Sequence, residues 1–358
     1  MQKKLLFIAL ILLAAALLSG CASGSAARGS TSWPGLAADS ENVYLADGSH
    51  VYAVSLKDGK EVWRYPEKPS SSLLFFAPPL LTEDGQLIVG SEGNDHHLFS
   101  LDPKTGKEKW VKPFAEAKDR WIASPLILNN RIYAPNADGF IYVLDMNGKQ
   151  LDTIEVGGAL WSSPATDGTL IYIASLDHHF HVINPAKKAM NEPIDLGGAA
   201  PGGTVVGPEG AYVGSFSSKI ESIKSNGERK ALAQTENWVW GRPTLDGTTL
   251  YYADLNGNVY SLDITTGKQN WGTVKPDGPI VASPLVYNDL IIVATEVGSV
   301  VALDRDGKNV WEREVGGKIY SNTAASGELI LVSPVQSEFY LAALDVDGKL
   351  AWTFKPEN

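Results

Sequence analysis

The side chains best suited to metal chemistry in this sequence are its six histidines, which gather in a few short segments. The richest segment is Asp177-His178-His179-Phe180-His181. On a β-strand, His179 and His181 would share one face, a spacing that can give two imidazole ligands to one metal ion. The single cysteine, Cys21, stands near the N-terminus and does not complete such a site, and His96 and His97 belong to a distant segment. His179 and His181 are therefore weak metal candidates, and exposed turn histidines are the better interpretation.

The acidic segment around residue 256 matches a calcium-binding loop only in its first residues. Asp254, Asn256 and Asn258 have the right spacing, but Thr265 stands where the loop needs a bidentate acid. An Asn256-Gly257 hairpin turn accounts for the same residues. The chain also has no nucleophile elbow, phosphate-binding glycine loop or paired-carboxylate signature in a supporting context. The sequence therefore predicts no catalytic residue, no cofactor and no metal site.

A second set of candidates is aromatic. These side chains lie just before the first expected strand of successive repeats: Phe75, Trp121, Trp161, Trp238, Trp240 and Tyr320. Trp and Tyr are enriched in binding hot spots. One interpretation is a partner or ligand face for a protein loop, a peptide or a sugar. The other, of equal weight, is that several of these rings pack beneath neighbouring loops.

The element that must position all these residues is a repeat of about 40 residues. The string Val-Ala-Leu-Asp-Arg-Asp-Gly-Lys-Asn-Val-Trp at 301–311 returns in related form at 52–63, 99–110, 260–271 and 341–352. Alternating Val, Ile, Tyr and Leu bounded by Asn, Asp and Gly predict four short antiparallel strands in each repeat. The fold class expected is all-β, an eight-bladed β-propeller over residues 33–358. The blades should begin near Trp33, Phe75, Trp121, Leu160, Gly198, Trp238, Pro279 and Lys318.

The tryptophan that closes the repeat is expected to pack between neighbouring blades, four residues after a turn glycine. Five repeats have it: Trp63, Trp110, Trp271, Trp311 and Trp352. Burial of each ring would contribute about 2 to 3 kcal/mol. The third, fourth and fifth blades carry Asp152, Glu192 and Ala231 at that position. This sector is either degenerate or under a different surface constraint, and the sequence leaves both alternatives open.

The N-terminus predicts export and lipidation. Lys3 and Lys4 precede an apolar run from Leu5 to Leu18, which is typical of a secretory leader and short for a membrane span. The segment at 18–21, Leu-Ser-Gly-Cys, resembles the bacterial lipobox, so residues 1–21 are expected to be a lipoprotein signal peptide with Cys21 as the lipidated residue. Residues 22–32 are rich in Ser, Gly and Ala and predict a flexible tether. We expect a bilayer anchor through acylated Cys21, in the outer membrane if the cell has one.

The net charge of the chain argues against nonspecific electrostatic binding of nucleic acid. Without Lys3 and Lys4, 28 basic and 41 acidic residues remain, a net charge of −13. A protein this acidic repels phosphate backbones and anionic lipid. Nucleic acid is therefore not an expected partner.

The repeat form Ala-Leu-Asp-x-x-Thr-Gly-Lys-x-x-Trp resembles that of the quinoprotein-type propellers. Within that superfamily, a lipobox, a short tether and eight blades together are similar to the outer-membrane assembly factor of the Bam complex, a non-enzymatic scaffold lipoprotein. The resemblance implies docking through the loop at 192–203 and an acidic pair before the sixth blade. Here that loop retains Pro201 without an arginine, and Trp238 and Trp240 stand where the acidic pair would be. The frame is shared, whereas the docking residues are not.

Two functions follow as expectations. The first is a non-enzymatic, extracytoplasmic lipoprotein that serves as a protein-binding scaffold in envelope or outer-membrane protein assembly, with envelope or membrane proteins bound through loops of one propeller face. The alternative is a receptor or surface enzyme for a glycan or quinone. A quinone-dependent dehydrogenase is disfavoured, because the single Cys21 cannot form the vicinal disulfide that the resemblance requires. Ring closure is expected to rest on packing of blade eight against blade one.

Overall fold

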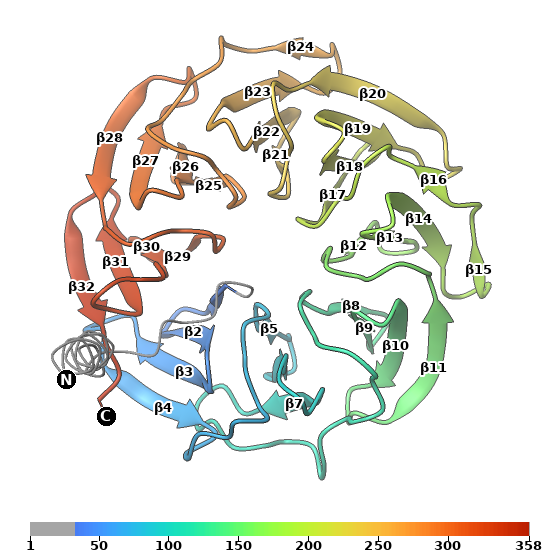
Figure 1. Ribbon diagram of the computed structural model, residues 1–358, viewed down its shortest axis with the longest axis vertical. Helices are drawn as coiled ribbons and strands as arrows, with labels where there is room; N and C mark the ends of the chain where they lie inside the picture. The colour runs from blue at the N-terminus through green and yellow to red at the C-terminus, as the bar shows by residue number, and fades with distance from the viewer. Residues whose placement is uncertain (1–32, 358) are drawn as a thin grey trace, which may run out of the picture. The chain divides into compact units, whose positions relative to one another are not determined.

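The computed structural model describes residues 33–357, and the predicted signal peptide, tether and Cys21 lie outside them. The described residues form eight antiparallel sheets arranged around one axis as a β-propeller (Figure 1). In each sheet the strands follow sequence order from the inner to the outer edge. The predicted fold class is therefore confirmed.

The first four blades are built from short strands joined by tight turns. Their bounds are β1 (Gly35–Ala38), β2 (Asn42–Asp47), β3 (His50–Ser55) and β4 (Glu61–Tyr65) in blade one; β5 (Leu80–Leu81), β6 (Leu87–Gly90) and β7 (Leu98–Leu101) in blade two; β8 (Leu126–Leu128), β9 (Arg131–Pro135), β10 (Phe140–Asp145) and β11 (Gln150–Glu155) in blade three; and β12 (Ala165–Thr166), β13 (Ile171–Ala174), β14 (His179–Asn184), β15 (Ala189–Met190) and β16 (Ile194–Asp195) in blade four.

The second four blades repeat this plan. Their bounds are β17 (Thr204–Gly207), β18 (Gly210–Ser215), β19 (Lys219–Ile223) and β20 (Arg229–Gln234) in blade five; β21 (Thr244–Asp246), β22 (Thr249–Ala253), β23 (Val259–Asp263) and β24 (Lys268–Gln269) in blade six; β25 (Leu285–Tyr287), β26 (Leu290–Ala294), β27 (Ser299–Leu303) and β28 (Asn309–Glu314) in blade seven; and β29 (Ala324–Ser326), β30 (Leu329–Val332), β31 (Leu341–Asp345) and β32 (Leu350–Phe354) in blade eight.

Two blades depart from four regular strands. The outer edge of blade two is reduced to isolated bridges that join Leu98 to Phe114 and Leu101 to Glu108. In blade four the outer edge is split, because β15 and β16 both pair with β14. Pro193 lies between these two pieces and has no N–H to donate to the ladder.

The core lies between the blades and not within any one of them. Alternate residues of the middle strands face opposite neighbours, as the strand period of two requires. In blade one, Val43 and Leu45 pack with residues of blade eight, whereas Tyr44 and Ala46 pack with residues of blade two. No blade could bury both of its faces alone, so the repeats stabilise one another around the ring.

Ring closure uses the same packing. The four strands of blade one and the four of blade eight each come from one continuous segment, so within residues 33–357 no strand is exchanged between the first blade and the last. Leu331 and Phe354 pack with Leu45 in one core cluster. The Oγ of Ser326 also donates a hydrogen bond of 2.6 Å to the carbonyl of Asp39. Within residues 33–357, no helix is long and apolar enough to cross a bilayer.

Candidate functional site

The pairing register of the innermost strands aligns the eight blades residue by residue. In blade six Thr244 pairs with Tyr251, and in blade four Ala165 pairs with Tyr172. The same pairing recurs in the other six blades. We take the inner-strand member of each pair, such as Thr244 in blade six and Ala165 in blade four, as the paired residue. Counting back from it identifies equivalent positions at the entrance of every inner strand.

The position five residues before the paired residue is buried in each of the seven blades, two to eight, in which it falls within residues 33–357. It holds Phe75, Trp121, Leu160, Ala200, Val239, Ile280 and Ile319. Phe75 and Trp121 are 0% and 1% exposed, and the Trp121 Nε1–H donates to the carbonyl of His96 at 3.0 Å. Neither ring is accessible, so their assignment to a partner or ligand face is corrected to a core role. The reason is strand alternation, because a shift of one residue moves a side chain to the opposite side.

The side chains at the next position, four residues before the paired residue, face away from the core. We call this set of residues the inner collar. Its half-exposed members are Trp33, Phe76, Ile122, Trp161, Trp240 and Tyr320. The equivalent residues of blades five and seven, Pro201 and Val281, are buried. The collar thus contains three of the six predicted face residues, together with Trp33, Phe76 and Ile122, which the sequence analysis missed.

Rings from distant blades meet in the collar. The ring centroid of Trp33 lies 5.2 Å from that of Trp240 and 5.0 Å from that of Tyr320, so blades one, six and eight converge. Trp238 is 48% exposed and stacks on Phe216 of blade five with centroids 4.7 Å apart. Phe216 also lies 5.2 Å from Trp240. A connected aromatic surface therefore extends from blade five to blade one.

A polar network holds Tyr320 at the edge of this surface. The Tyr320 hydroxyl donates to Oε1 of Glu296 at 2.8 Å, and Lys318 Nζ lies 3.0 Å from the same atom. The hydrogen bond from Lys318, followed by that from Tyr320, lowers the pKa of Glu296. Glu296 therefore remains ionised, and this side of the aromatic surface carries compensated charge.

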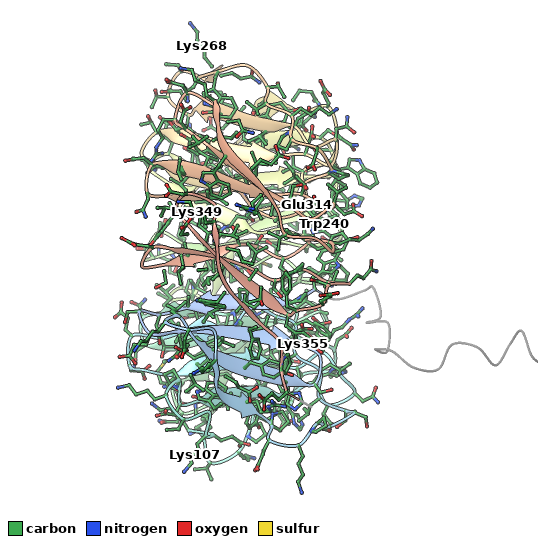
Figure 2. All side chains as sticks on the ribbon, turned by 90° about the vertical axis from the view of Figure 1, so that its left-hand side faces the viewer. Lys107, Trp240, Lys268, Glu314, Lys349 and Lys355 are labelled. Atoms are coloured by element: carbon green, nitrogen blue, oxygen red, sulfur yellow. The ribbon has the colours of Figure 1, made fainter. Side chains whose placement is uncertain are left out.

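The collar and the turns that follow the third strands lie on opposite faces of the ring. Figure 2 shows the ring edge-on, with Lys107 and Lys349 of these turns on the left and Trp240 toward the right. Glu314 and Lys355, where outer strands end, also lie toward the right. Strands alternate in direction, so the collar shares its face with the loops that carry the chain from one blade to the next.

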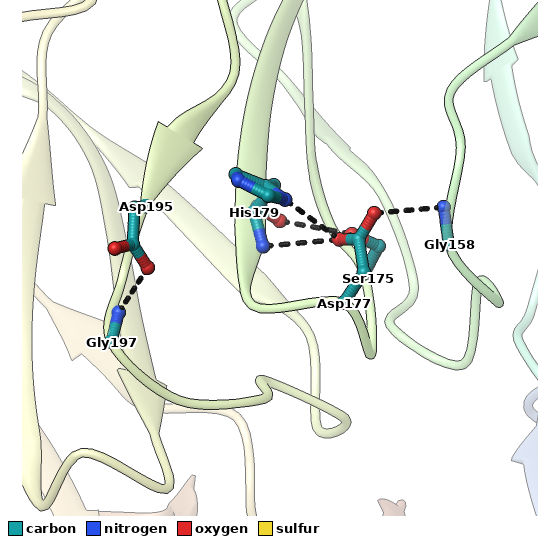
Figure 3. Close-up of polar contacts among 6 residues, drawn as sticks. All are labelled: Gly158, Ser175, Asp177, His179, Asp195 and Gly197. Atoms are coloured by element: carbon teal, nitrogen blue, oxygen red, sulfur yellow. Dashed lines mark hydrogen bonds and ion pairs between the residues drawn. The ribbon is translucent and has the colours of Figure 1, made fainter.

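The histidine-bearing turn of blade four is organised by a carboxylate (Figure 3). Asp177 accepts the backbone N–H of Gly158 at 3.0 Å and that of His179 at 3.1 Å, and the hydroxyl of Ser175 also donates to it. The Nδ1 atom of His179 lies 3.2 Å from Oδ1 of Asp177. The carboxylate therefore ties this turn to the loop that enters the blade.

The two weak metal candidates are placed differently from each other. His181 is 1% exposed, and burial lowers its pKa and keeps its ring neutral. His179 is half-buried, and the two ring centroids are 6.4 Å apart. Among residues 33–357, no group of three or more His, Cys, Asp or Glu side chains is arranged to hold a metal ion.

The calcium-like segment is a hydrogen-bonded turn. Oδ1 of Asp254 accepts the backbone N–H groups of Asn256 at 2.9 Å and Asn258 at 3.1 Å. Oδ2 accepts the Tyr260 hydroxyl at 2.8 Å, and burial together with this bond raises the pKa of Tyr260 to about 12. The carboxylate oxygens are thus committed to the blade's own turn.

The five repeat tryptophans lie at the outer edge, where each contacts the turn glycine of the next blade. A Cβ atom on the contacted glycine would lie 2.6–2.7 Å from the ring. The indole N–H donates to a carbonyl of the same turn, as Trp110 does to Met146 at 2.9 Å and Trp311 to Val346 at 2.8 Å. Trp352 makes this contact with blade one, through the carbonyl of Leu56 at 3.0 Å. These rings join blades 1–2, 2–3, 6–7, 7–8 and 8–1.

Two of the three remaining outer contact regions between blades, or seams, use other contacts. At the third, between blades five and six, Gly267 has no neighbour within 4 Å of its Cβ position. Between blades three and four, Asp152 pairs with Lys188 at 2.6 Å, and Lys188 occupies the turn position that is glycine elsewhere. A groove of about 290 Å³ lies at this seam, with Tyr133, Ile154 and Met190 in its wall. Between blades four and five, Arg229 binds the buried Glu221 of its own blade at 2.6 Å and also donates a hydrogen bond to the carbonyl of Asp195 in blade four.

A model of the family described as outer membrane protein assembly factor BamB matches residues 22–190 and 209–353. The chain belongs to this family.

Similar curated proteins include two members of that family and an enzyme. The outer membrane protein assembly factor BamB of Burkholderia pseudomallei is 30% identical over 113 residues, which cover 32% of this chain and 29% of that protein. The BamB of Moranella endobia is 24% identical over 281 residues, or 71% and 69% of the two chains. A tetrathionate hydrolase of Acidithiobacillus ferrooxidans is 26% identical over 219 residues, 58% of this chain and 41% of that one. The chain thus spans less than half of the first curated relatives that it matches.

Among solved structures, the crystal structure of BamB from Moraxella catarrhalis has a similar fold. Its TM-score is 0.69 at 17% sequence identity, and the alignment covers 84% of this chain and 93% of that one. At this identity, the likeness supports the propeller fold alone.

Proposed function

We propose that this protein is an extracytoplasmic lipoprotein, anchored through Cys21, that acts as a non-enzymatic protein-binding scaffold in outer-membrane protein assembly. The observation that carries the proposal is the exposed aromatic surface formed by the inner collar with Trp238 and Phe216. Large rings that are half-exposed and grouped on one face are typical of partner-binding surfaces. Membership of the assembly-factor family supports the same role.

Trp238 and Trp240 are the residues of this surface that we expect to contribute most to binding. Both stand before the inner strand of blade six, and both contact Phe216 of blade five. A ring held by a neighbouring ring loses little conformational freedom when a partner covers it. Truncation of such an anchor typically weakens binding at least tenfold.

The experiment is crosslinking of the full-length lipoprotein in its native envelope, followed by purification and identification of stoichiometric partners. The Trp238→Ala/Trp240→Ala variant should lose the crosslinked partner. The matched control is Leu350→Ala, which removes a 54% exposed apolar side chain from the outer edge of blade eight. Repeated recovery of the uncrosslinked monomer from wild-type cells, or equal loss with the control, would contradict the proposal.

The anchor requires its own test. Cys21→Ser should abolish acylation, measured as the loss of fatty-acid mass from the mature N-terminus, and should release the protein from the membrane fraction. Unchanged membrane association and mass would contradict the lipoprotein assignment while leaving the scaffold proposal open to the crosslinking test.

The second candidate function is binding or turnover of a small ligand at the same aromatic surface. The similarity to a tetrathionate hydrolase keeps this candidate in view, because it shows that enzymes share the repeat. A thermal-shift screen with sugars and quinones separates the two functions. A saturable shift that Trp161→Ala or Trp240→Ala abolishes would favour the ligand receptor over the scaffold.

A further inference from the structure

One position at the inner edge of the ring carries a single charge. It lies two residues after the inner collar in each blade and is occupied by Gly35, Pro78, Ser124, Ser163, Gly203, Arg242, Ser283 and Asn322. Seven of these residues are small or neutral. Arg242 is the exception, and nothing in the repeat pattern requires it.

Side chains at this position reach back toward the preceding blade. The hydroxyl of Ser163 accepts the backbone N–H of Ser124 at 3.1 Å, and that of Ser283 accepts the N–H of Arg242 at 2.9 Å. Arg242 follows the same direction toward Gly203 of blade five. A Cβ atom on Gly203 would lie 3.4 Å from Cδ of Arg242, so the glycine leaves room for the arginine stem.

The Arg242 guanidinium has no anionic partner among residues 33–357. No ion pair or side-chain hydrogen bond involves it, whereas Arg64, Arg229 and Arg305 each bind a carboxylate. Protein atoms surround the group and lower its pKa by desolvation, yet the residue is exposed to solvent. A side chain that is enclosed by protein along its length and ends in the water of the central channel accounts for both the lowered pKa and the exposure. Strand β21, which follows Arg242, lies at the edge of this channel.

The collar lies next to this charge along the chain. Trp240 precedes Arg242 by two residues in the segment that enters β21. Trp33 and Tyr320 stack near Trp240 and bring the rings of two further blades to the same place. An unpaired guanidinium next to half-exposed rings is complementary to a group that joins an anion to an apolar body.

We propose that Arg242 and the inner collar bind a carboxylate attached to an apolar group, with the guanidinium holding the carboxylate and the rings of Trp240, Trp33 and Tyr320 covering the apolar part. The guanidinium presents two parallel N–H donors that match a carboxylate. The C-terminal end of a polypeptide with an apolar last residue has this chemistry, and so does a free aromatic or aliphatic acid. The inference deepens the proposed function and rests on it for the access of a partner to the collar.

The test compares ligands that differ only in the anion. The probes are a five-residue alanine peptide ending in phenylalanine, the same peptide as its C-terminal amide, and 3-phenylpropionate as the free acid. Binding to the full-length protein is measured by calorimetry and by quenching of tryptophan fluorescence. The free peptide acid should bind about tenfold to a hundredfold more tightly than the amide, because a hydrogen-bonded charge is lost in the amide.

Variants assign the preference to the site. Arg242→Gln should remove the difference between acid and amide, and Arg242→Lys should retain part of it, because lysine keeps the charge without the planar fork. The control Arg131→Gln changes an exposed arginine of β9 and should leave the preference intact. Thermal unfolding of each variant checks its fold.

The outcomes are distinct. Tight binding of the peptide acid with weak binding of 3-phenylpropionate identifies a polypeptide end as the source, and the reverse order identifies a free acid. Equal affinity for acid and amide, no binding of any probe, or an acid preference that survives in Arg242→Gln would overturn the proposal. Failure of partner crosslinking alone would not overturn this proposal, because peptide binding is measured on the isolated protein.

Discussion

The outer contacts between neighbouring blades, the seams, are of two kinds. Comparing them shows which outer contacts recur and which the fold can replace. Five seams are held by a tryptophan on a turn glycine, and the glycines adopt φ values of 68–79°. The seams after blades three, four and five instead have an ion pair at Asp152, a buried carboxylate bound by Arg229, and an open Gly267 with no neighbour within 4 Å of its Cβ position. The middle-strand core is continuous through both sectors.

This difference shows that the tryptophan requires a glycine opposite it, whereas the glycine does not require the tryptophan, since Gly267 is retained at a seam that lacks the ring. At the seam between blades three and four both are replaced, since Lys188 stands where the glycine would be. A side chain there would collide with an indole packed as in the other seams, so the two changes belong together. The groove at this seam shows that the packing is looser there.

The largest effect should come from removing a seam tryptophan. Trp110 is 6% exposed, and Trp110→Ala should lower the free energy of unfolding by about 3 to 5 kcal/mol through lost burial and a cavity. Urea unfolding monitored by circular dichroism measures this loss. The control is Trp238→Ala, which removes an exposed tryptophan and should cost far less. Equal losses would show that the seam contact is not what stabilises the ring.

The polar seam between blades four and five should be next. Arg229→Ala leaves Glu221, whose side chain is 1% exposed, without its cation, and the cost should be about 3 kcal/mol. Lys230→Ala on the same strand is the control, because that side chain is exposed. A loss no larger than that of the control would mean that the carboxylate has another stabilising partner.

The glycine turns offer a matched pair. Gly348→Ala would place a Cβ atom 2.6 Å from the Trp311 ring, whereas Gly267→Ala meets nothing within 4 Å, and φ is positive at both. Both variants carry the strain of a left-handed residue, so their difference isolates the clash, about 1 to 3 kcal/mol. Thermal unfolding of the two proteins side by side gives this difference. Equal stability would indicate that the indole moves aside freely.

Glu221 should give the polar seam a pH dependence. Burial raises its pKa above the unfolded value of 4.5, despite the opposing effect of Arg229. The native state therefore holds this proton more strongly than the unfolded state, so the contribution to stability falls as pH rises above about 4.5. Urea unfolding of wild type and Glu221→Gln between pH 4 and 8 should show wild type losing stability relative to the variant. A wild type that gains stability over this range would reverse the assigned shift.

The smallest effect should come from the ion pair between Asp152 and Lys188, at the seam between blades three and four. Asp152 and Lys188 are largely exposed, with 39% and 78% of their side chains accessible. Exposed ion pairs contribute little, because water and salt screen them and two side chains lose freedom. Asp152→Ala should leave the urea midpoint unchanged within error. A clear destabilisation would show that this pair replaces the tryptophan energetically and not only in position.

Much of the architecture could be predicted because it repeats. The blade count and the strand pattern followed from the spacing of Asp, Gly and Trp, which turn chemistry and seam packing both constrain. The candidate surface was predicted less well, since Phe75 and Trp121 align by residue type with Trp161 and Trp240 but lie one residue earlier in register. Residue type alone does not reveal this offset of one residue. Counting back two residues from Ser124 of the Ser-Pro pair gives Ile122 and not Trp121.

By itself, the sequence determined the number of blades, the order of strands within each blade and the five seams that carry a tryptophan, because these are local or nearest-neighbour properties. Only the tertiary structure decided which entrance residues face the core and which form the inner collar, because that choice depends on strand register. It also brought together Trp33, Trp240 and Tyr320, which belong to blades one, six and eight. Contacts across the axis join residues far apart in the chain, and no local pattern encodes them.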